Sequence, residues 1–432
     1  MSRVLVLASE HVGREMAGPA IRAYELARVL AAAGHRVTLG APSIDPVGDG
    51  ALELVVADRA TVNRLAGPHD AILLQGWVLE RFPALADAGT PLVVDLYDPF
   101  GLELLSLLDH RPAAERDQAQ AAALRALVDQ LRAGDFFLCA SEQQRDYWLG
   151  WLDAAGRVNR HTHDADRSLR ELIDVVPFGV PAAPPAPRAR AMRGVLPGVG
   201  RDDVVVLWGG GVYNWFDPAT LVRAVARVAA SRPALRLVFM TDRHPNPAMP
   251  PMRAVEEARR AAEELGVAGG HVVFNPGWVA YESRADWLAE SDIGASTHRD
   301  SVEARFSFRT RILDYLWAGL PVVCTAGDAL AGEVQARELG AAVPPGDVDA
   351  LAAALTRLAS DPQLRAECGL RARQLAATLT WEQVAAPLVR FGEAPRRAPD
   401  LAAGGPLQPR RDRRLSRRAL AAQVRRIRGV GR

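Results

Sequence analysis

The sequence predicts an α/β protein built from two Rossmann-like βα domains that face a central cleft. Short apolar runs without polar alternation recur along the 432 residues, with helical segments between them. Such runs are typical of parallel strands that are buried on both faces of a sheet. Four prolines within residues 181–187 interrupt this alternation of strands and helices near the middle of the chain, and the alternation then starts again. We therefore expect a first domain over 1–180, a Pro-rich linker over 181–200 and a second domain over 201–392.

Hydrophobic spacing places the elements of each domain. The first domain is expected to begin with a strand, a helix and a strand at residues 4–8, 21–33 and 36–40. Its remaining strands are expected at 71–74, 92–96, 136–140 and 173–176, with a long helix over 102–132. Strands of the second domain are expected at 204–208, 235–240, 272–274, 293–296, 321–325 and 341–344, and its last helix ends near 391. Because ligands bind at the carboxyl ends of such strands, a binding cleft is expected between the domains.

Composition excludes several classes of protein. With 49% apolar and 24% charged residues, the chain resembles ordinary globular proteins. All 52 Lys-plus-Arg residues are arginines, which excludes Schiff-base chemistry, P-loop phosphate binding and protein kinase catalysis, since each needs a lysine. The cysteines Cys139, Cys324 and Cys368 stand far apart, so buried thiols in a reducing compartment are expected. No apolar run reaches the roughly 18 residues of a membrane-spanning helix, so a cytoplasmic location is expected.

The C-terminal end carries a strong positive charge. The net charge of the chain is +1, but residues 410–432 hold ten arginines and one acid. We expect residues 393–432 to be a disordered linker followed by this basic tail. Leu420, Val424 and Ile427 fall on one helical stripe, which favours a helix at an anionic membrane surface, while a disordered end is equally supported. The tail has no aromatic residue to stack on bases, so no nucleic-acid partner is expected.

Glycine-rich turns offer sites for a phosphate. No G-x-G-x-x-G follows the first strand, and Asn214 stands where the third glycine would follow Gly209, Gly210 and Gly211, so a dehydrogenase is not expected. Three successive glycines can still present N–H groups to an anion, although a simple turn would also use them. Gly18 offers similar chemistry just before the first helix. Because the two glycine sites fall on opposite domains, one diphosphate could be held between them.

A segment over residues 303–323 gathers charged side chains at the start of a helix. Arg309, Arg311 and Asp314 lie near the beginning of this helix, and Gly319 ends it. Arginines near a helix N-terminus oppose the helix dipole, so they cost stability unless an anion is present. A bound phosphate would supply that anion through bidentate contacts. The alternative is a solvated surface pair with Asp314 as the counter-ion.

Four motifs point to one enzyme family. They are the segment just described, AGP at 17–19, VPFG at 176–179 and GD at 346–347. In these motifs the chain resembles family 4 glycosyltransferases, which have the GT-B fold, over about residues 1–390. The resemblance implies transfer of a sugar from a nucleotide diphosphate donor with retention at the anomeric carbon, without a metal or a cofactor. It makes the first domain the acceptor side and the second domain the nucleotide-sugar side.

The resemblance also implies roles for acidic residues. Family members carry an E-x7-E pair of glutamates in the helix before the G-x-P-V-V sequence. Asp314 falls on the second glutamate, so the resemblance implies that Asp314 binds the ribose hydroxyls. The first glutamate, which contacts the donor sugar, falls on Phe306, and the nearest acid, Glu303, is assigned that contact instead.

The chain departs from the family at the diphosphate. The usual arginine and lysine after the first strand of the second domain are replaced by Gly210 and by the aromatic residues Trp215 and Phe216. We therefore expect Arg309 and Arg311 to carry the diphosphate, with Arg311 also acting in catalysis.

The acceptor side departs from the family as well. Family histidines are replaced by Gln75 and by the pair Tyr97 and Asp98. Asp98 is expected to orient the acceptor hydroxyl, and an Asx turn before a proline explains it equally well. Trp278 follows a strand where family members hold the nucleotide base, although filling of the domain interface would also account for it.

Histidine and aspartate residues that resemble metal ligands are interpreted as structural. His161, His163 and Asp166 fall in a polar stretch between a helix and a strand, which favours a solvated loop. The D-x-D patterns at 164–166 and 347–349 are attributed to chance, and Asp347 or Asp349 is expected to cap the following helix. No metal site is therefore expected.

Together these observations predict a glycosyltransferase that builds a cell-surface or secreted polysaccharide. Its partners would be a nucleotide-sugar donor, a glycan or lipid-linked acceptor and, through the tail, the inner face of the cell membrane. Two alternatives remain open. One is a catalytically inert GT-B homologue that serves as a binding or scaffold subunit, and the other is a GT-B nucleotide-sugar epimerase.

Overall fold

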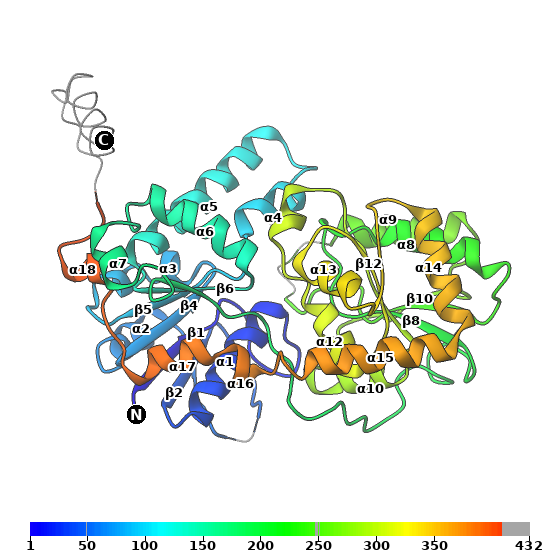
Figure 1. Ribbon diagram of the computed structural model, residues 1–432, viewed down its shortest axis with the longest axis horizontal. Helices are drawn as coiled ribbons and strands as arrows, with labels where there is room; N and C mark the ends of the chain where they lie inside the picture. The colour runs from blue at the N-terminus through cyan, green and yellow to red at the C-terminus, as the bar shows by residue number, and fades with distance from the viewer. Residues whose placement is uncertain (49, 247–248, 250, 408–432) are drawn as a thin grey trace, which may run out of the picture.

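Two parallel β-sheets, one in each lobe of Figure 1, organise the chain. The computed structural model describes residues 1–48, 50–246, 249 and 251–407. Residues 408–432, which include the tail stripe, lie outside this described part. In the described part every strand pairing within the two sheets is parallel, as the unbroken apolar runs predicted.

The first sheet has seven strands in the order β3-β2-β1-β4-β5-β6-β7. The strands are β1 (Arg3–Leu7), β2 (Arg36–Ala41), β3 (Glu53–Val56), β4 (Ala71–Gln75), β5 (Leu92–Asp95), β6 (Phe136–Cys139) and β7 (Ile173–Val175). The central strands β4, β5 and β6 are buried along their whole length, because helices cover both faces. β3 was not predicted. It lies at the sheet edge, and its residues stay partly or fully exposed although Leu54, Val55 and Val56 are apolar.

The second sheet has six strands in the order β10-β9-β8-β11-β12-β13. The strands are β8 (Val204–Trp208), β9 (Leu235–Phe239), β10 (Val272–Phe274), β11 (Ile293–Ser296), β12 (Val322–Thr325) and β13 (Gly340–Val343). All six were predicted to within a residue or two. β11 and β12 are buried throughout, which is the burial that produced their unbroken apolar sequence.

Helices of the first domain cover its sheet. They are α1 (Gly18–Ala32), α2 (Arg59–Ala66), α3 (Val78–Arg81), α4 (Phe100–Leu107), α5 (Ala113–Ala133), α6 (Glu142–Ala154) and α7 (Arg160–Ala165), with the 3-10 turn η1 (Pro83–Asp87). The single long helix expected over 102–132 is wrong: Pro112 caps α5 and separates it from α4. The loop expected around His161 and Asp166 is also wrong. Asn159 caps this stretch through a capping box, so it forms α7.

Helices of the second domain alternate with its strands. They are α8 (Pro218–Ala229), α9 (Arg253–Glu264), α10 (Arg284–Ala289), α11 (Val302–Phe306), α12 (Thr310–Ala318), α13 (Ala329–Ala336), α14 (Val348–Ser360) and α15 (Pro362–Ala376), with the 3-10 turn η2 (Tyr281–Ser283). The carboxylate of Asp347 accepts a hydrogen bond from the Ala350 N–H at 2.8 Å. This is the helix cap that the sequence predicted.

The chain returns to the first domain after α15, along the lower edge in Figure 1. The helices α16 (Trp381–Val384) and α17 (Ala386–Glu393) contact α1, and the Phe391 ring stacks on that of Phe136 with centroids 5.1 Å apart. Where this segment meets the interdomain linker, the Val180 N–H donates to Leu379 O at 2.8 Å and the Trp381 N–H donates to Val180 O at 3.1 Å. The two connections between the domains therefore lie side by side.

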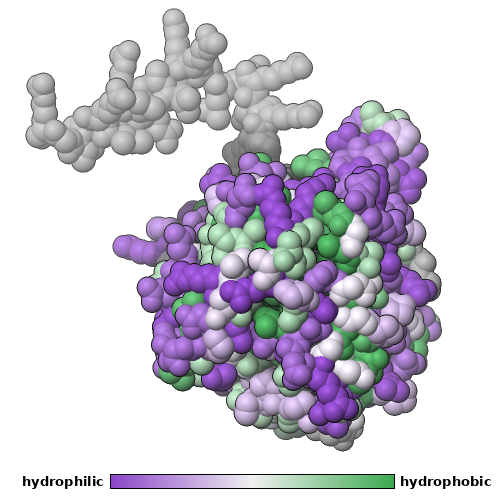
Figure 2. All heavy atoms as spheres, turned by 90° about the vertical axis from the view of Figure 1, so that its right-hand side faces the viewer, coloured by the Kyte–Doolittle hydropathy of each residue, from purple (hydrophilic) through white to green (hydrophobic). Residues whose placement is uncertain are grey.

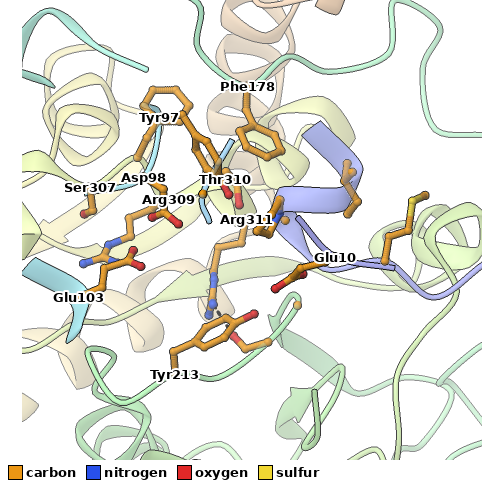
Figure 3. Close-up of a pocket in the computed structure, with 18 of the residues that line it drawn as sticks. Glu10, Tyr97, Asp98, Glu103, Phe178, Tyr213, Ser307, Arg309, Thr310 and Arg311 are labelled. Carbon is orange, nitrogen blue, oxygen red and sulfur yellow. Dashed lines mark hydrogen bonds between the residues drawn. The ribbon is translucent and has the colours of Figure 1, made fainter. Parts of the chain in front are cut away.

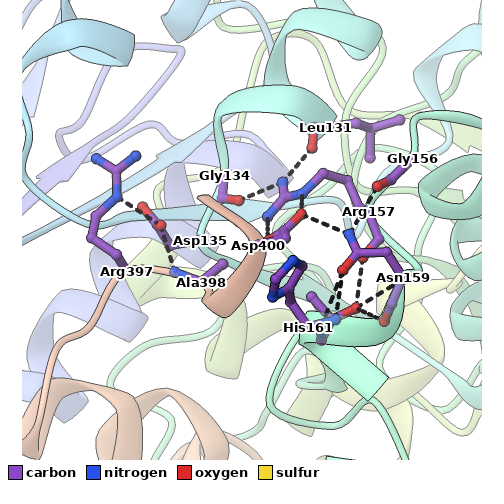
Figure 4. A network of polar contacts seen from close by, with 11 residues as sticks. Leu131, Gly134, Asp135, Gly156, Arg157, Asn159, His161, Arg397, Ala398 and Asp400 are labelled. Carbon is purple, nitrogen blue, oxygen red and sulfur yellow. Dashed lines mark hydrogen bonds and ion pairs between the residues drawn. The ribbon is translucent and has the colours of Figure 1, made fainter. Parts of the chain in front are cut away.

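Residues 393–407 are ordered, so the disordered linker expected from 393 onward is wrong over this range. The short helix α18 (Pro399–Ala402) places Asp400 in the interior, where it forms an ion pair with Arg157 at 2.6 Å, both side chains being fully buried (Figure 4). Arg157 also donates to the carbonyls of Leu131 and Gly134. This pair joins residues far apart in the chain, and composition alone gave no sign of it.

Figure 2 views the outer end of the second domain, where hydrophilic residues surround smaller apolar areas. Exposed large apolar side chains are scattered, as Leu265 at 47% and Val302 at 60% illustrate. Among the described residues, no helix is both long and apolar enough to cross a bilayer. The three cysteines are buried and unbridged.

Candidate functional site

A cavity of about 440 Å³ lies between the two domains, at the carboxyl ends of their strands. The first domain contributes loops that follow β1, β4 and β5 together with the start of α1, and the second domain contributes the turn after β8 and the start of α12. The cleft is therefore where the two-sheet architecture predicted it. Figure 3 shows side chains from both domains pointing into this space.

Most of the predicted site residues line the cavity. Those on its wall are Gly18, Asp98, Gly209, Gly210, Gly211, Trp278, Arg309, Arg311 and Asp314. Glu303 is the exception. It is 2% exposed on α11, behind Arg309, and its Oε2 accepts a hydrogen bond from Arg309 Nη2 at 2.7 Å. The sugar contact assigned to Glu303 is therefore not supported by its position, because an ion pair occupies the side chain away from the wall.

Arg311 is a buried cation in the cavity wall. Its guanidinium lies over the rings of Trp208 and Phe216, at 4.3 and 4.1 Å from their centres, and Nη2 donates to Gly211 O at 2.5 Å. No carboxylate pairs with Arg311 in the described part of the chain, and Nη1 has no partner there. Burial lowers the pKa of Arg311 to about 10. The solvated surface pair considered from the sequence is thus wrong, since only 8% of the residue is exposed.

Arg309 lies close to Arg311 in sequence but in a different environment. It is the N-cap residue of α12, is almost fully buried and is paired with Glu303. Figure 3 shows its head group beside Asp98 and Glu103, and its charge opposes the upward pKa shifts of both carboxyls. Arg309 is therefore already neutralised by the protein, whereas Arg311 is not.

Asp314 is held by a residue that the sequence did not single out. Arg284 Nε lies 3.3 Å from Asp314 Oδ1, and its guanidinium is 3.8 Å from the centre of the Tyr281 ring. Burial raises the pKa of Asp314, and the charge of Arg284 opposes that shift. The Tyr281 hydroxyl in turn donates to Glu25 on α1 at 2.9 Å, across the domain interface. Asp314 is thus oriented by Arg284 rather than by Arg309 or Arg311.

Three carboxyl groups line the first-domain wall. Glu10 follows β1, Asp98 follows β5, and Glu103 lies on α4. Burial, with a contribution from Asp98, raises the pKa of Glu10 to about 7. Burial raises the pKa of both Asp98 and Glu103, and each of the two carboxyls influences the pKa of the other. Only Asp98 was predicted. The sequence signal for Glu10 is its place directly after the first strand, whereas Glu103 carries no comparable signal.

The glycine turn after β8 differs in detail from the expected anion site. The Gly209 N–H already donates to the Tyr315 hydroxyl at 2.7 Å, and the Gly211 carbonyl accepts from Arg311. Gly210 has φ of +80°, a left-handed conformation that favours glycine and turns the chain toward the cavity. Gly209 therefore does not offer its N–H to an anion as predicted. The turn instead fixes Arg311.

Other predicted residues take supporting places. Gln75 Nε2 donates to Pro19 O at 2.7 Å and so holds the start of α1 at the cavity. Trp278 lies on the wall, with its ring centre 5.8 Å from that of His244. Throughout the described ranges, no three His, Cys, Asp or Glu side chains gather in a metal-binding arrangement.

Known proteins resemble this chain in both sequence and fold. Residues 203–361 match the family model described as Glycosyl transferases group 1. A D-inositol 3-phosphate glycosyltransferase of Nocardioides is 25% identical over 334 residues, which cover 76% of this chain and 68% of the relative. The enzyme of that name from Kribbella flavida is 28% identical over 242 residues, and the match spans only 55% of its length.

Solved structures share the fold at low sequence identity. Sucrose-phosphate synthase from Thermosynechococcus elongatus superposes with a TM-score of 0.64 at 18% identity, covering 91% of this chain and 98% of that one. WaaG, a glycosyltransferase involved in lipopolysaccharide biosynthesis, gives 0.61 at 17% identity, covering 93% and 100%. Anabaena HepE in complex with UDP-glucose gives 0.56 at 17% identity, covering 91% and 99%.

Proposed function

Because the protein is a glycosyltransferase with the GT-B fold and a group 1 domain at residues 203–361, we propose that it is a retaining enzyme that uses a nucleoside diphosphate sugar. The acceptor would be a glycan or lipid-linked sugar in cell-surface polysaccharide synthesis. The enzyme would work in the cytoplasm at the inner face of the membrane. A relative in lipopolysaccharide biosynthesis and another crystallised with UDP-glucose support this choice of donor and pathway class.

One observation carries the proposal: Arg311 is a buried cation with no carboxylate partner in the described chain, facing the cavity. An isolated buried charge is costly unless a ligand or a side chain of opposite sign compensates it. A diphosphate group at this wall would supply that compensation through its negative charge. The N-terminus of α1 at Gly18 faces the same cavity from the first domain and adds favourable partial charge.

The remaining donor contacts follow from this placement. Asp314, oriented by Arg284, would accept hydrogen bonds from the ribose hydroxyls. Trp278 on the same wall would contact the base. Arg309 and its partner Glu303 would support α12 from behind, so Arg309 contributes positive potential rather than a direct phosphate contact.

Transfer with retention requires little from the protein beyond placement and charge stabilisation. The acceptor oxygen bonds to the anomeric carbon on the face that the diphosphate leaves, and the bond between that carbon and the diphosphate oxygen breaks. The acceptor proton passes to a leaving phosphate oxygen, while Arg311 stabilises the developing negative charge. Asp98, on the opposite wall, would orient the acceptor hydroxyl.

The acceptor is proposed to differ from that of the curated relatives. Their names specify D-inositol 3-phosphate, an anion. The first-domain wall of this chain instead presents Glu10, Asp98 and Glu103, which would repel a phosphate. We therefore propose that the acceptor of this chain carries no phosphate group.

The direct test is a screen of UDP-, GDP- and dTDP-sugars by thermal unfolding, because a bound donor stabilises the fold by mass action. Nucleoside diphosphate release is then measured with and without acceptor. Release that depends on acceptor supports the proposal. Donor binding without release under any acceptor favours the inert homologue, and interconversion of donor sugars without an acceptor favours the epimerase.

A further inference from the structure

The side chain of Gln144 connects the backbones of the two domains. Gln144 lies in the first turn of α6 and is fully buried. Its Nε2 donates one hydrogen bond to Tyr97 O and another to Phe306 O, both at 2.7 Å. Tyr97 belongs to the first domain and Phe306 to the second, so a single amide group bonds to both.

The amide of Gln144 does more than cap its own helix. Ser141 is the N-cap residue of α6, and Gln144 stands three residues later, where a Gln or Glu side chain reaches back to the backbone. Its Oε1 accepts a hydrogen bond from the Ala140 N–H at 2.7 Å. A glutamate could accept this bond equally well. An amide also brings two N–H donors, which a carboxylate lacks, and both donate to the carbonyls of Tyr97 and Phe306.

In the first domain, α6 holds the backbone that leads to Asp98. Trp148, one turn after Gln144, donates from Nε1 to Leu96 O at 2.8 Å, and Gln144 donates to Tyr97 O. These two successive carbonyls stand directly before Asp98, which lines the cavity. The helix therefore fixes the part of the first-domain wall that is proposed to orient the acceptor.

In the second domain, the same helix holds the end of α11. Phe306 is the last residue of α11, and its ring centre lies 4.8 Å from that of Tyr147 on α6. Three residues later, Arg309 begins the turn into α12, which carries Arg311 in the cavity wall. Phe306 itself is not among the residues that line the cavity. Its carbonyl and its ring instead attach the donor wall to the first domain.

Burial distinguishes this connection from the contact at the rim of the cleft. Arg253 and Asp109 also join the two domains, but their side chains are 35% and 41% exposed. Exposed ion pairs contribute little stability, because water competes for both charges. The bonds of Gln144 are shielded from water. Opening of the cleft would require Nε2 of Gln144 to leave Phe306 O, since the two atoms belong to different domains.

We propose that Gln144 is a positioning residue, which holds the loop of Asp98 and the start of α12 at the spacing at which acceptor and donor react. The inference rests on the proposed function, because it takes these two walls to hold the acceptor and the donor. Gln144 does not line the cavity, so it acts through the backbone of residues that do. Loss of its two donors would leave each wall intact and change how the walls face each other.

The test measures the opening of the cleft in the full chain. The three native cysteines are buried, so spin labels are attached at the introduced positions Ala114→Cys on α5 and Glu256→Cys on α9. Both positions are exposed, one in each domain. Pulsed electron paramagnetic resonance then gives the distribution of distances between the two labels, at pH 8, in the empty chain and with nucleotide.

Three variants at neighbouring positions of α6 are compared. Gln144→Glu keeps an acceptor for the Ala140 N–H but sets a carboxylate oxygen against the two carbonyls, so we expect roughly half of the molecules or more to move to a longer label distance. Gln144→Met removes the donors without adding a charge and should shift a smaller fraction. Gln143→Glu makes the same chemical change at an exposed position and is the matched control, which keeps the wild-type distance.

Release of nucleotide gives a second readout. The nucleotide is whichever of UDP, GDP and dTDP stabilises the wild-type chain most, and its dissociation is followed by stopped flow. We expect Gln144→Glu to release it about threefold faster or more, because loss of contacts acts mainly on dissociation rates. Gln143→Glu should release it at the wild-type rate. Unchanged label distances in both Gln144 variants, or longer distances without faster release, overturn the inference.

A further variant keeps the test decisive if Gln144→Glu does not fold. Tyr147→Leu removes the ring contact with Phe306 and leaves the amide bonds in place, so it should also lengthen the label distance. An unchanged distance in Tyr147→Leu then overturns the inference.

Failure of this inference is separable from failure of the proposed function. If a nucleotide stabilises the wild-type chain but the label distances do not change, only the role of Gln144 is wrong. If UDP, GDP and dTDP all fail to stabilise the wild-type chain, the donor site at Arg311 is wrong, and the label distances in the empty chain decide whether Gln144 holds the domains together.

Discussion

Arg309 Nη2 donates to Glu303 Oε2 at 2.7 Å, and both side chains are almost completely buried. This ion pair joins the start of α12 to α11 and leaves Glu303 away from the cavity wall. It also separates two arginines that look alike in the sequence. Arg309 has an internal counter-ion, whereas Arg311 has no carboxylate partner among the described residues.

Replacing Arg311 with alanine removes the one unpaired cation that the described residues place on the donor wall. We expect Arg311→Ala to weaken binding of UDP by about 2–5 kcal/mol, since the diphosphate loses its buried partner. Titration calorimetry measures the change. Arg260→Ala, at a 70% exposed side chain on α9, is the control and leaves UDP affinity at the wild-type value. Unchanged affinity in Arg311→Ala would exclude the phosphate role.

Replacing Glu303 distinguishes a supporting role from a sugar contact. Glu303→Gln removes the ion-pair partner of the buried Arg309, so we expect a loss of about 3–5 kcal/mol in the free energy of unfolding. Urea denaturation measures it. The double variant Glu303→Leu with Arg309→Met removes both charges and recovers much of the stability. A stable Glu303→Gln protein with normal UDP affinity but greatly reduced turnover would instead restore the sugar contact.

Asp314 is expected to select ribose. Its carboxylate would accept two hydrogen bonds from the ribose hydroxyls, whereas an amide oxygen would accept fewer. Asp314→Asn should therefore discriminate less between UDP and its 2′-deoxy analogue, by roughly 1–2 kcal/mol. Competition binding with the two nucleotides measures the preference. If the variant keeps the wild-type preference, Asp314 serves only as the partner of Arg284.

Glu10 gives the stability of the empty protein a definite pH dependence. Its pKa is raised from 4.5 in the unfolded chain to about 7 in the fold, so the folded state binds the extra proton between these values. Stability contributed by this group is complete below pH 4.5 and is lost as the pH rises through 7. Glu10→Gln should therefore be more stable than wild type at pH 8, by about 2–3 kcal/mol, with little difference at pH 4. Thermal unfolding across this range tests the sign, and a variant that gains nothing at pH 8 would contradict it.

The basic tail, which lies outside the described residues, is tested by deletion. Removing residues 408–432 should leave folding and UDP binding unchanged, because residues 393–407 are already anchored by Asp400. The full chain should co-sediment with vesicles containing anionic lipid at low salt and detach at high salt, where charges are screened within a Debye length of about 3 Å at 1 M. Failure of the full chain to co-sediment at low salt excludes the membrane role.

The sequence predicted the two sheets well, because strands that are buried throughout, such as β5 and β12, are recognised from their apolar runs. β3 and the segment around Asp400 escaped prediction for a physical reason. The edge strand β3 is four residues long and none of them is fully buried, and a fully buried ion pair such as Arg157 with Asp400 depends on a partner 243 residues away. Charged residues in a proline-rich stretch are ordinarily typical of disorder.

The sequence predicted most of the residues that line the cavity, but it did not predict which charged residues form ion pairs with each other. Most expected residues line the cavity, since motif spacing reports which loops converge at the strand ends. Spacing does not report which cation takes which carboxylate. The pairs Arg309 with Glu303 and Arg284 with Asp314 depend on side-chain reach in three dimensions, and Arg284 could not be recognised before α10 was packed against α12.

The adjacent crossings at Val180 and Leu379 determine how the cleft can open. The two backbone segments, joined by hydrogen bonds, can act as a hinge. Sliding or twisting of one domain past the other would break these hydrogen bonds, whereas rotation about the hinge would keep them. Rotation about this edge has its largest lever arm at the opposite rim, where Arg253 contacts Asp109 by one exposed ion pair at 2.7 Å. A rotation of a few degrees at the hinge would therefore widen that rim most.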